Sequence, residues 1–349
     1  MGLADYSAFI LGGLPKQGQT LEEVKDLLLN EIKKLRAGEF DEKMLQANIN
    51  NFKLYELQSM ESNEGRADIF VNSFINGTNW EDEVTAIDRM AKLTKEDIVA
   101  FADKYLKEDN YAVVYKKQGK DPNEKKMTKP EITPIVSNRD VASPFLTSIQ
   151  ENAVKPIEPV FLDFKKDMSQ LTAKSDIPVL YKQNTTNDLF QLIYVFDMGN
   201  NNDKALGTAF DYLEYLGTSD MTPEELKSEF YRLACTFYVS PGNERTYVVL
   251  SGLNENMPAA MQLFEKLLAD AQVNKEAYNN LVGDILKARA DAKLNQGQNF
   301  SRLMNYAMYG PKSPATNLLT EAELASMNPQ ELVDQIHNQN NYKPVSYTH

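Results

Sequence analysis

The sequence ALGTAFDYLEYLGTSDMTPEELKSEFYRLACTFY, residues 205–238, predicts two helices separated by a sharp turn. Leu206, Phe210 and Leu213 recur at helical spacing and give the first helix one apolar face. Gly217 is expected to adopt the left-handed conformation that ends a helix. This pair of helices is the reference point for the rest of the chain.

The second helix of the pair carries strong start signals. Thr222 is expected as its N-cap and Pro223 as its first helical residue. Glu225 would complete a capping box with Thr222.

The first helix contains the motif Asp211-Tyr-Leu-Glu214-Tyr215. Asp211 and Tyr215 are four residues apart and therefore share a helical face. In many zinc enzymes this spacing carries two histidines, with a nearby glutamate as base. Neither flanking position is histidine here, so the motif has the skeleton of a metal-binding helix without its ligands. Phe210, Tyr212 and Tyr215 are interpreted as core side chains rather than a peptide-binding stripe.

Composition excludes two broad classes of function. The net charge of −13 argues against nucleic-acid binding, which needs basic patches. No apolar run reaches the roughly 18 residues of a membrane span. The 349 residues suffice for two domains of ordinary size, and 42% hydrophobic residues suffice for a packed core.

The chain offers few zinc ligands. Cys235 is the only cysteine, and its apolar neighbours favour a core residue over a nucleophile. The two histidines are His337 and His349, and His337 is interpreted as a helix-end residue beside the negative pole of the dipole. A zinc site would therefore have to use carboxylates, which is uncommon.

Residues 1–117 are predicted as helices between two strand segments, 5–15 and 110–115. Further helices are expected over residues 67–75 and 80–93. Two strands are too few for a complete sheet, so this region is expected to be the later part of a module. The helix boundary signals are Thr20 with Glu23, then Gly38, Asp41, and Thr94 with Asp97.

Residues 118–170 are predicted to be a Pro-rich linker. Six prolines interrupt this stretch, and it has no sustained hydrophobic period. Apolar patches at residues 144–149 and 160–164 favour partial docking on a domain surface.

Residues 171–349 are predicted as a second, complete module. The combination of strands and helices indicates an α+β fold with an antiparallel or mixed sheet packed on one face by helices. Asn328 with Glu331 is expected to form a capping box for the last helix. The expected strands cover residues 177–182, 190–197, 236–239, 245–250 and 341–347, and the main helices after them cover 258–271 and 275–294.

The two regions end alike. A capped helix starting at Leu93-Thr94 leads to Asn110-Tyr111, and one starting at Met327-Asn328 leads to Asn341-Tyr342. The matching order of elements predicts two copies of one module, the first lacking its beginning.

This pattern resembles the pitrilysin/insulinase (M16, inverzincin) family of zinc metallopeptidases, whose modules have a LuxS/metallopeptidase-like fold. The family motif is H-x-x-E-H with a distant glutamate ligand. The resemblance places Asp211 at the first histidine, Glu214 at the catalytic glutamate and Tyr215 at the second histidine. The distant ligand falls near Asp284 or Asp291, between which the sequence does not choose. The match is carried by the helix, by the leucine before the glutamate and by the Leu-Gly-Thr that follows the motif.

The resemblance implies a non-catalytic portion of a zinc metalloendopeptidase that forms the wall of a peptide-degrading chamber. It implies that residues 1–117 end the second module, that 118–170 join the two halves, and that 171–349 form most of an inactive third module. No catalytic or metal-binding residue is expected here, and zinc would lie in a catalytic module outside the chain. Expected partners are other modules or a partner subunit, with peptides as substrates of the whole enzyme, in the periplasm or cell envelope. The alternative is a stand-alone, catalytically dead binding or assembly module.

Overall fold

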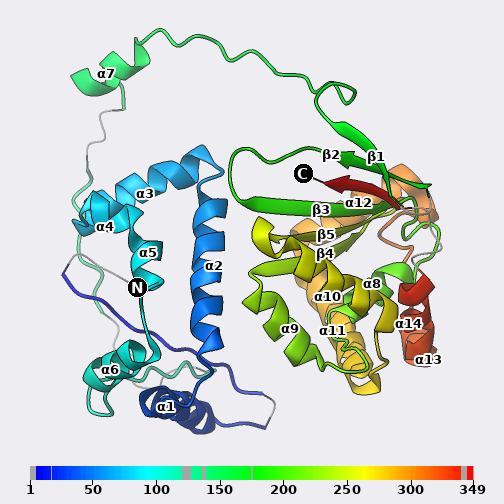
Figure 1. Cartoon of the computed structure of the whole chain (residues 1–349), viewed down its shortest axis with the longest axis horizontal. Coiled ribbons are helices and arrows are strands. Elements are labelled where there is room, and N and C mark those ends of the chain that lie inside the picture. Colours follow the sequence, from blue (N-terminus) through cyan, green and yellow to red (C-terminus); the bar gives the residue numbers. More distant parts are fainter. Residues whose placement is uncertain are drawn as a thin grey trace.

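The structure is a computed structural model that describes residues 5–16, 18–119, 127–135, 139–173, 176–338 and 344–348. Figure 1 shows two bodies side by side, joined by a long segment that passes above both. We call residues 21–105 the helical unit and residues 169–348 the sheet unit.

The helical unit contains the expected helices. Thr20 and Glu23 form the predicted capping box, and Gly38 ends the first helix at φ 70°. Thr94 and Asp97 form the second predicted box. The helices are α1 (Leu21–Ala37), α2 (Lys43–Ser59), α3 (Asn63–Asn76), α4 (Trp80–Val84), α5 (Ala86–Met90) and α6 (Lys95–Tyr105).

Both strands expected around this unit are wrong. Across the described residues up to 119, Ser7 makes only an isolated bridge and no strand forms. A strand exists only where a neighbour accepts its backbone hydrogen bonds, and a sequence pattern cannot supply that neighbour.

The helix α2 begins one residue later than the predicted cap Asp41 implies. Asp41 accepts a hydrogen bond from the Lys43 amide at 3.0 Å, but the N-cap position is Glu42. Phe52 and Tyr55 on this helix are exposed although they are aromatic. The buried residues of α2 are Ala47, Ile49, Asn51 and Leu54.

The connecting segment carries one short helix, α7 (Pro144–Gln150). The prediction that its apolar patches dock is wrong for the side chains described. Phe145, Val160 and Phe161 are all exposed. An extended chain presents no continuous face, so apolar residues alone do not hold it against a surface.

The sheet unit contains a mixed, six-stranded sheet with the order β1-β2-β6-β3-β5-β4. β2 and β6 are parallel, and the other neighbours are antiparallel. Strand β1 was not anticipated, because SQLTA is short and mostly polar and lacks an apolar run. The strands are β1 (Ser169–Ala173), β2 (Ile177–Tyr181), β3 (Leu189–Phe196), β4 (Cys235–Pro241), β5 (Thr246–Leu253) and β6 (Pro344–Thr348).

The helices expected in this unit are confirmed. Asn328 is the N-cap of the last one, but its side chain accepts from the Gln330 amide at 3.2 Å and the expected capping box with Glu331 is not formed. The helices are α8 (Leu206–Leu213), α9 (Pro223–Arg232), α10 (Met257–Asp270), α11 (Lys275–Leu294), α12 (Gln296–Tyr309), α13 (Glu321–Ser326) and α14 (Pro329–His337), with short 3₁₀ turns at Asn254–Asn256 and Gly310–Lys312.

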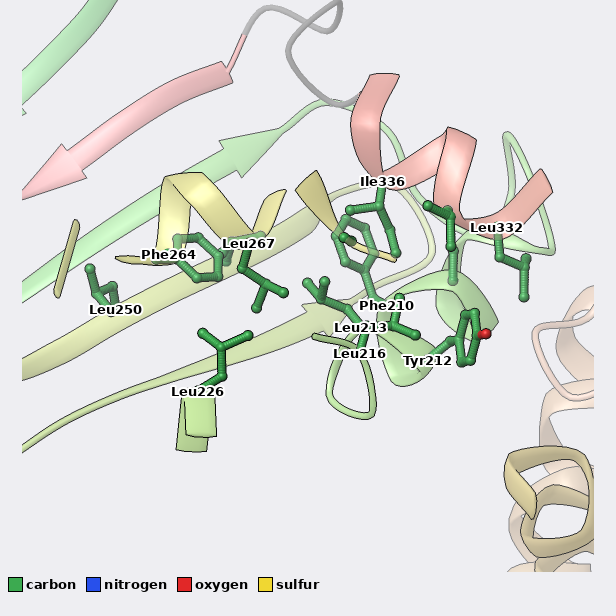
Figure 2. Packing of buried hydrophobic residues seen from close by; sticks show 14 of the residues in the cluster. Phe210, Tyr212, Leu213, Leu216, Leu226, Leu250, Phe264, Leu267, Leu332 and Ile336 are labelled. Carbon is green, nitrogen blue, oxygen red and sulfur yellow. The ribbon is translucent and has the colours of Figure 1, made fainter. Parts of the chain in front are cut away.

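The core lies between the sheet and the helices on one of its faces. Figure 2 shows Phe210 and Leu213 of α8 meeting Phe264 and Leu267 of α10 and Ile336 of α14. All five side chains are buried. Helix α8, which carries most of the degenerate motif, is therefore packed between α10, α14 and the sheet.

Candidate functional site

Helix α8 ends inside the motif. Its last residue is Leu213, and Glu214 occupies the C-cap position. The Tyr215 amide donates to the Tyr212 carbonyl at 3.0 Å, which is a tight end turn. Asp211 and Tyr215 are therefore not on one continuous helical face, and the predicted shared face is wrong.

Gly217 ends this turn for a different reason from the one predicted. It is absent from the described glycines with positive φ. A Cβ at this position would lie 2.3 Å from the Met221 carbonyl oxygen and 3.1 Å from Cδ of Pro223. The glycine permits a close backbone approach between the two helices of the pair rather than a left-handed cap. The capping box of α9, formed by Thr222 and Glu225, is present as predicted.

The motif positions face solvent. Asp211, Glu214 and Tyr215 are exposed, whereas Phe210 and Tyr212 are buried. The core interpretation is thus confirmed for Phe210 and Tyr212 and wrong for Tyr215.

Tyr212 was missed as a structural anchor. Its hydroxyl donates to the Asn274 carbonyl at 2.6 Å and accepts from the Asn274 amide at 2.8 Å. Its ring meets Tyr278 edge-on at 5.7 Å, and the Tyr278 hydroxyl donates to the Leu324 carbonyl at 2.7 Å. Figure 2 shows the Tyr212 hydroxyl directed away from the apolar cluster. Asn274 is the N-cap of α11. The sequence contains no local signal that pairs this residue with Tyr212, which lies 62 residues earlier.

At Asp211 the surroundings disfavour negative charge. Partial burial raises the pKa of the Asp211 carboxyl, and the neighbouring Glu214 carboxylate raises it further. The ring of Tyr215 lies 5.7 Å from Nζ of Lys227, which is a cation–π contact.

Replacing Asp211 with asparagine is expected to stabilise the chain at pH 7 by no more than about 0.5 kcal/mol. The folded-state pKa is raised, so the ionised carboxylate opposes folding above that pKa. Below the unfolded value of 3.8 the carboxyl is protonated in both states, and the advantage should disappear. Thermal unfolding at pH 7 and pH 3 measures this difference. Asp284→Asn controls for general relief of negative charge, and an equal gain at both pH values would contradict the expectation.

Neither candidate for the distant ligand joins the motif. Asp284 and Asp291 are exposed on α11, and Asp291 lies 3.8 Å from Nζ of Lys287. Within the described ranges, no three His, Cys, Asp or Glu side chains form a group that could hold a metal ion.

The remaining candidates occupy structural positions. Cys235 is buried, as interpreted, and burial raises the pKa of its thiol to about 12. His337 lies in the last turn of α14, as interpreted. His349 lies outside the described residues.

Among the helices that the structure describes, none combines the length and apolar content needed to cross a lipid bilayer.

No family model matches the sequence, and no curated protein matches it. The structure is similar to the peptidase M16 inactive domain from Pseudomonas fluorescens, with a TM-score of 0.45 and 14% identity over 52% of this chain and 46% of that chain. It is also similar to the periplasmic protease PqqL from Escherichia coli, with a TM-score of 0.46 and 12% identity over 94% of this chain and 39% of that one. A third similar structure is a mutant of the ferredoxin protease FusC in complex with Arabidopsis ferredoxin, with a TM-score of 0.46 and 11% identity over 91% of this chain and 38% of that chain. The chain thus spans less than half the length of each of these structures.

Proposed function

We propose that this chain is a non-catalytic portion of a zinc metalloendopeptidase. The observation that carries the proposal is the state of the α8 motif. Phe210 and Tyr212 anchor this helix to the core, while Asp211, Glu214 and Tyr215 present two carboxyls and a phenol to solvent. The motif thus lies at the end of a well-packed helix, and none of its three solvent-facing positions carries a histidine.

The donor set at this site does not fit zinc. Catalytic zinc is held by three protein ligands, most often histidines with one carboxylate or cysteine. A glutamate base without a metal has no zinc-bound water to deprotonate. No catalytic step is therefore assigned to Glu214, and the zinc of the whole enzyme would belong to another module.

The module arrangement proposed is 1–117 as the end of one M16-like module, 118–170 as linker and 171–349 as a second, non-catalytic module. The order of helices supports it. In the helical unit the 14-residue helix α3 precedes short helices and then α6, which has a side-chain cap. In the sheet unit the 14-residue helix α12 likewise precedes short helices and then α14, which also has a side-chain cap. In the sheet unit the region that follows is strand β6. The role proposed for both modules is to form the wall of a chamber that admits peptides and excludes folded proteins.

We expect the dialysed chain to contain far less than one zinc per molecule. Metal analysis by inductively coupled plasma mass spectrometry measures this directly. Near one zinc per chain, lost in Glu214→Ala but kept in the control Glu224→Ala on neighbouring α9, would overturn the proposal of an inactive module.

A catalytically dead assembly module is the second candidate, and one observation favours it. The helical unit exposes a contiguous aromatic pair, Phe70 stacked on Trp80 at 4.5 Å, beside Phe74, which is 88% exposed. Apolar surface of this kind marks an interaction site. The coding sequence that precedes this chain distinguishes the two candidates. An upstream H-x-x-E-H module in the same reading frame supports the peptidase, and its absence supports the assembly module.

A further inference from the structure

The two units touch through one face of α2. Helix α2 packs on α9, and Leu54 is buried in a small cluster with Leu189, Ala234 and Leu253 of the sheet unit. Two polar contacts, one from α2 and one from the residue after its C-cap, also join the units. They are Lys53 Nζ to Glu255 at 3.6 Å and Asn187 Nδ2 to Glu61 Oε1 at 3.0 Å.

Asn51 lies at the centre of this face and is only 7% exposed. Its Nδ2 donates to the Ala47 carbonyl within α2 at 2.8 Å. The same Nδ2 donates to the Tyr231 carbonyl at 2.7 Å, across 180 residues of sequence. Tyr231 is in the last turn of α9, where the helix alone does not satisfy the carbonyls. Its carbonyl accepts one bond from the Ala234 amide at 3.0 Å, and Asn51 Nδ2 is a second donor to it. Asn51 therefore acts as a C-cap that α2 supplies to α9.

Tyr231 is held by α2 at a second point. Its hydroxyl donates to Asn48 Oδ1 at 2.6 Å. Asn48 and Asn51 are three residues apart on α2 and lie on one face. Both the carbonyl and the hydroxyl of Tyr231 are therefore hydrogen-bonded to α2. Two bonds at different points of one residue prevent α2 from sliding along α9.

The backbone that follows Tyr231 is strained, in the stretch 231–235 that we call the α9–β4 corner. Ala234 has φ 46°, a left-handed conformation that is rare for a residue with a Cβ. Cys235 is the next residue, and its Sγ donates to the Leu233 carbonyl at 3.4 Å. Strain of this kind persists only when the surroundings over-determine it.

We propose that Asn51 and Asn48 form a register lock, meaning a pair of hydrogen bonds that fixes the position of α2 along α9. Through this lock α2 caps α9 and holds the α9–β4 corner closed. Helix α2 therefore moves together with the sheet unit. The surface formed by α9 and the α9–β4 corner is thus occupied by α2 of the same chain. These contacts between α2 and α9 do not depend on the proposed peptidase role.

Cys235 provides a reporter for this lock in the full-length chain. It is the only cysteine, and it is buried directly beside Ala234. The rate at which dithionitrobenzoate labels a buried thiol follows the population of the open state. In Asn51→Asp the donor is replaced by a carboxylate that faces a carbonyl oxygen, so this corner should open more often.

The labelling rate of Asn51→Asp is expected to rise roughly tenfold or more over that of the unmodified chain. A tenfold rise corresponds to a decrease of about 1.4 kcal/mol in the free energy of opening the corner. Asn50→Asp is the matched control, because Asn50 Oδ1 accepts from Gln46 Nε2 of α2 itself at 2.9 Å. It should label at the unmodified rate. Asn48→Ala, which removes only the acceptor of the Tyr231 hydroxyl, should show an intermediate increase.

Circular dichroism reports whether each variant folds, and if Asn51→Asp does not, the Asn48→Ala rate decides. Labelling of both variants at the unmodified rate would overturn the lock. An equal acceleration in Asn50→Asp would also overturn it, because the effect would then come from charge on α2 rather than from the cap.

Discussion

Replacing Phe264 with alanine is expected to lower the free energy of unfolding by about 3–5 kcal/mol, the range for deleting a buried aromatic side chain. Phe264 on α10 is fully buried. Its ring centroid lies 4.9 Å from that of Phe237 on β4 and 6.5 Å from that of Tyr194 on β3. Truncation removes both aromatic contacts and leaves a cavity between the sheet and its helices, where the backbone of both layers resists collapse.

Phe300→Ala on α12 is the matched control. The same atoms are deleted, but Phe300 is 63% exposed, so the change should stay within about 0.5 kcal/mol. Urea unfolding followed by fluorescence and circular dichroism measures both. Similar losses in the two variants would mean that the core is not where the structure places it.

Replacing Gly252 with alanine should be the most damaging single methyl addition in the sheet unit. Gly252, on β5, has φ 156° and pairs with Cys235 on β4. A Cβ would lie 2.4 Å from the Ala234 carbonyl oxygen and 2.7 Å from Cα of Cys235. These are backbone atoms that cannot rotate away, so the strand pair must separate. Backbone strain and overpacking each cost roughly 1–3 kcal/mol, so a loss of at least about 2 kcal/mol is expected.

Gly283→Ala tests the same substitution where space is free. Gly283 is on the exposed side of α11, and a Cβ would meet nothing within 4 Å. Alanine there should stabilise the chain by roughly 0.4–1 kcal/mol, because glycine loses more entropy in a helix. Thermal unfolding should therefore move in opposite directions for the two variants. A tolerated Gly252→Ala would show that the α9–β4 corner is looser than its geometry indicates.

Sequence reasoning recovered the features that short-range chemistry determines. The boxes at Thr20, Thr94 and Thr222 were predicted because a capping box closes within four residues. The strands β2 and β3 and the helices of the sheet unit were likewise predicted close to their observed positions. The degenerate motif on α8 was also visible, since the identities of Asp211 and Tyr215 suffice to show that histidines are missing.

The errors fall where a residue's role depends on a distant partner. Residues 110–115 carry strand-like sequence but remain unpaired, whereas the polar stretch of β1 is a strand because β2 lies beside it. Gly217 was predicted to be left-handed, but what requires a glycine there is the close approach of the Met221 backbone. Strand pairing and close backbone contact are properties of two segments at once, and neither can be read from one of them.

The sequence by itself thus determined the α+β class, most helix boundaries and the absence of histidine from the motif, because these depend on neighbours within a few residues. The tertiary structure decided which faces are buried and which side chains couple the units. Asn51 is an ordinary polar residue in the sequence of α2, and it became a cap only when folding brought Tyr231 within 2.7 Å of its amide. Tyr212 likewise became an anchor only when Asn274 met its hydroxyl. The physical reason is that a buried polar group must find a partner, and the fold, not the local sequence, determines which partner is within reach.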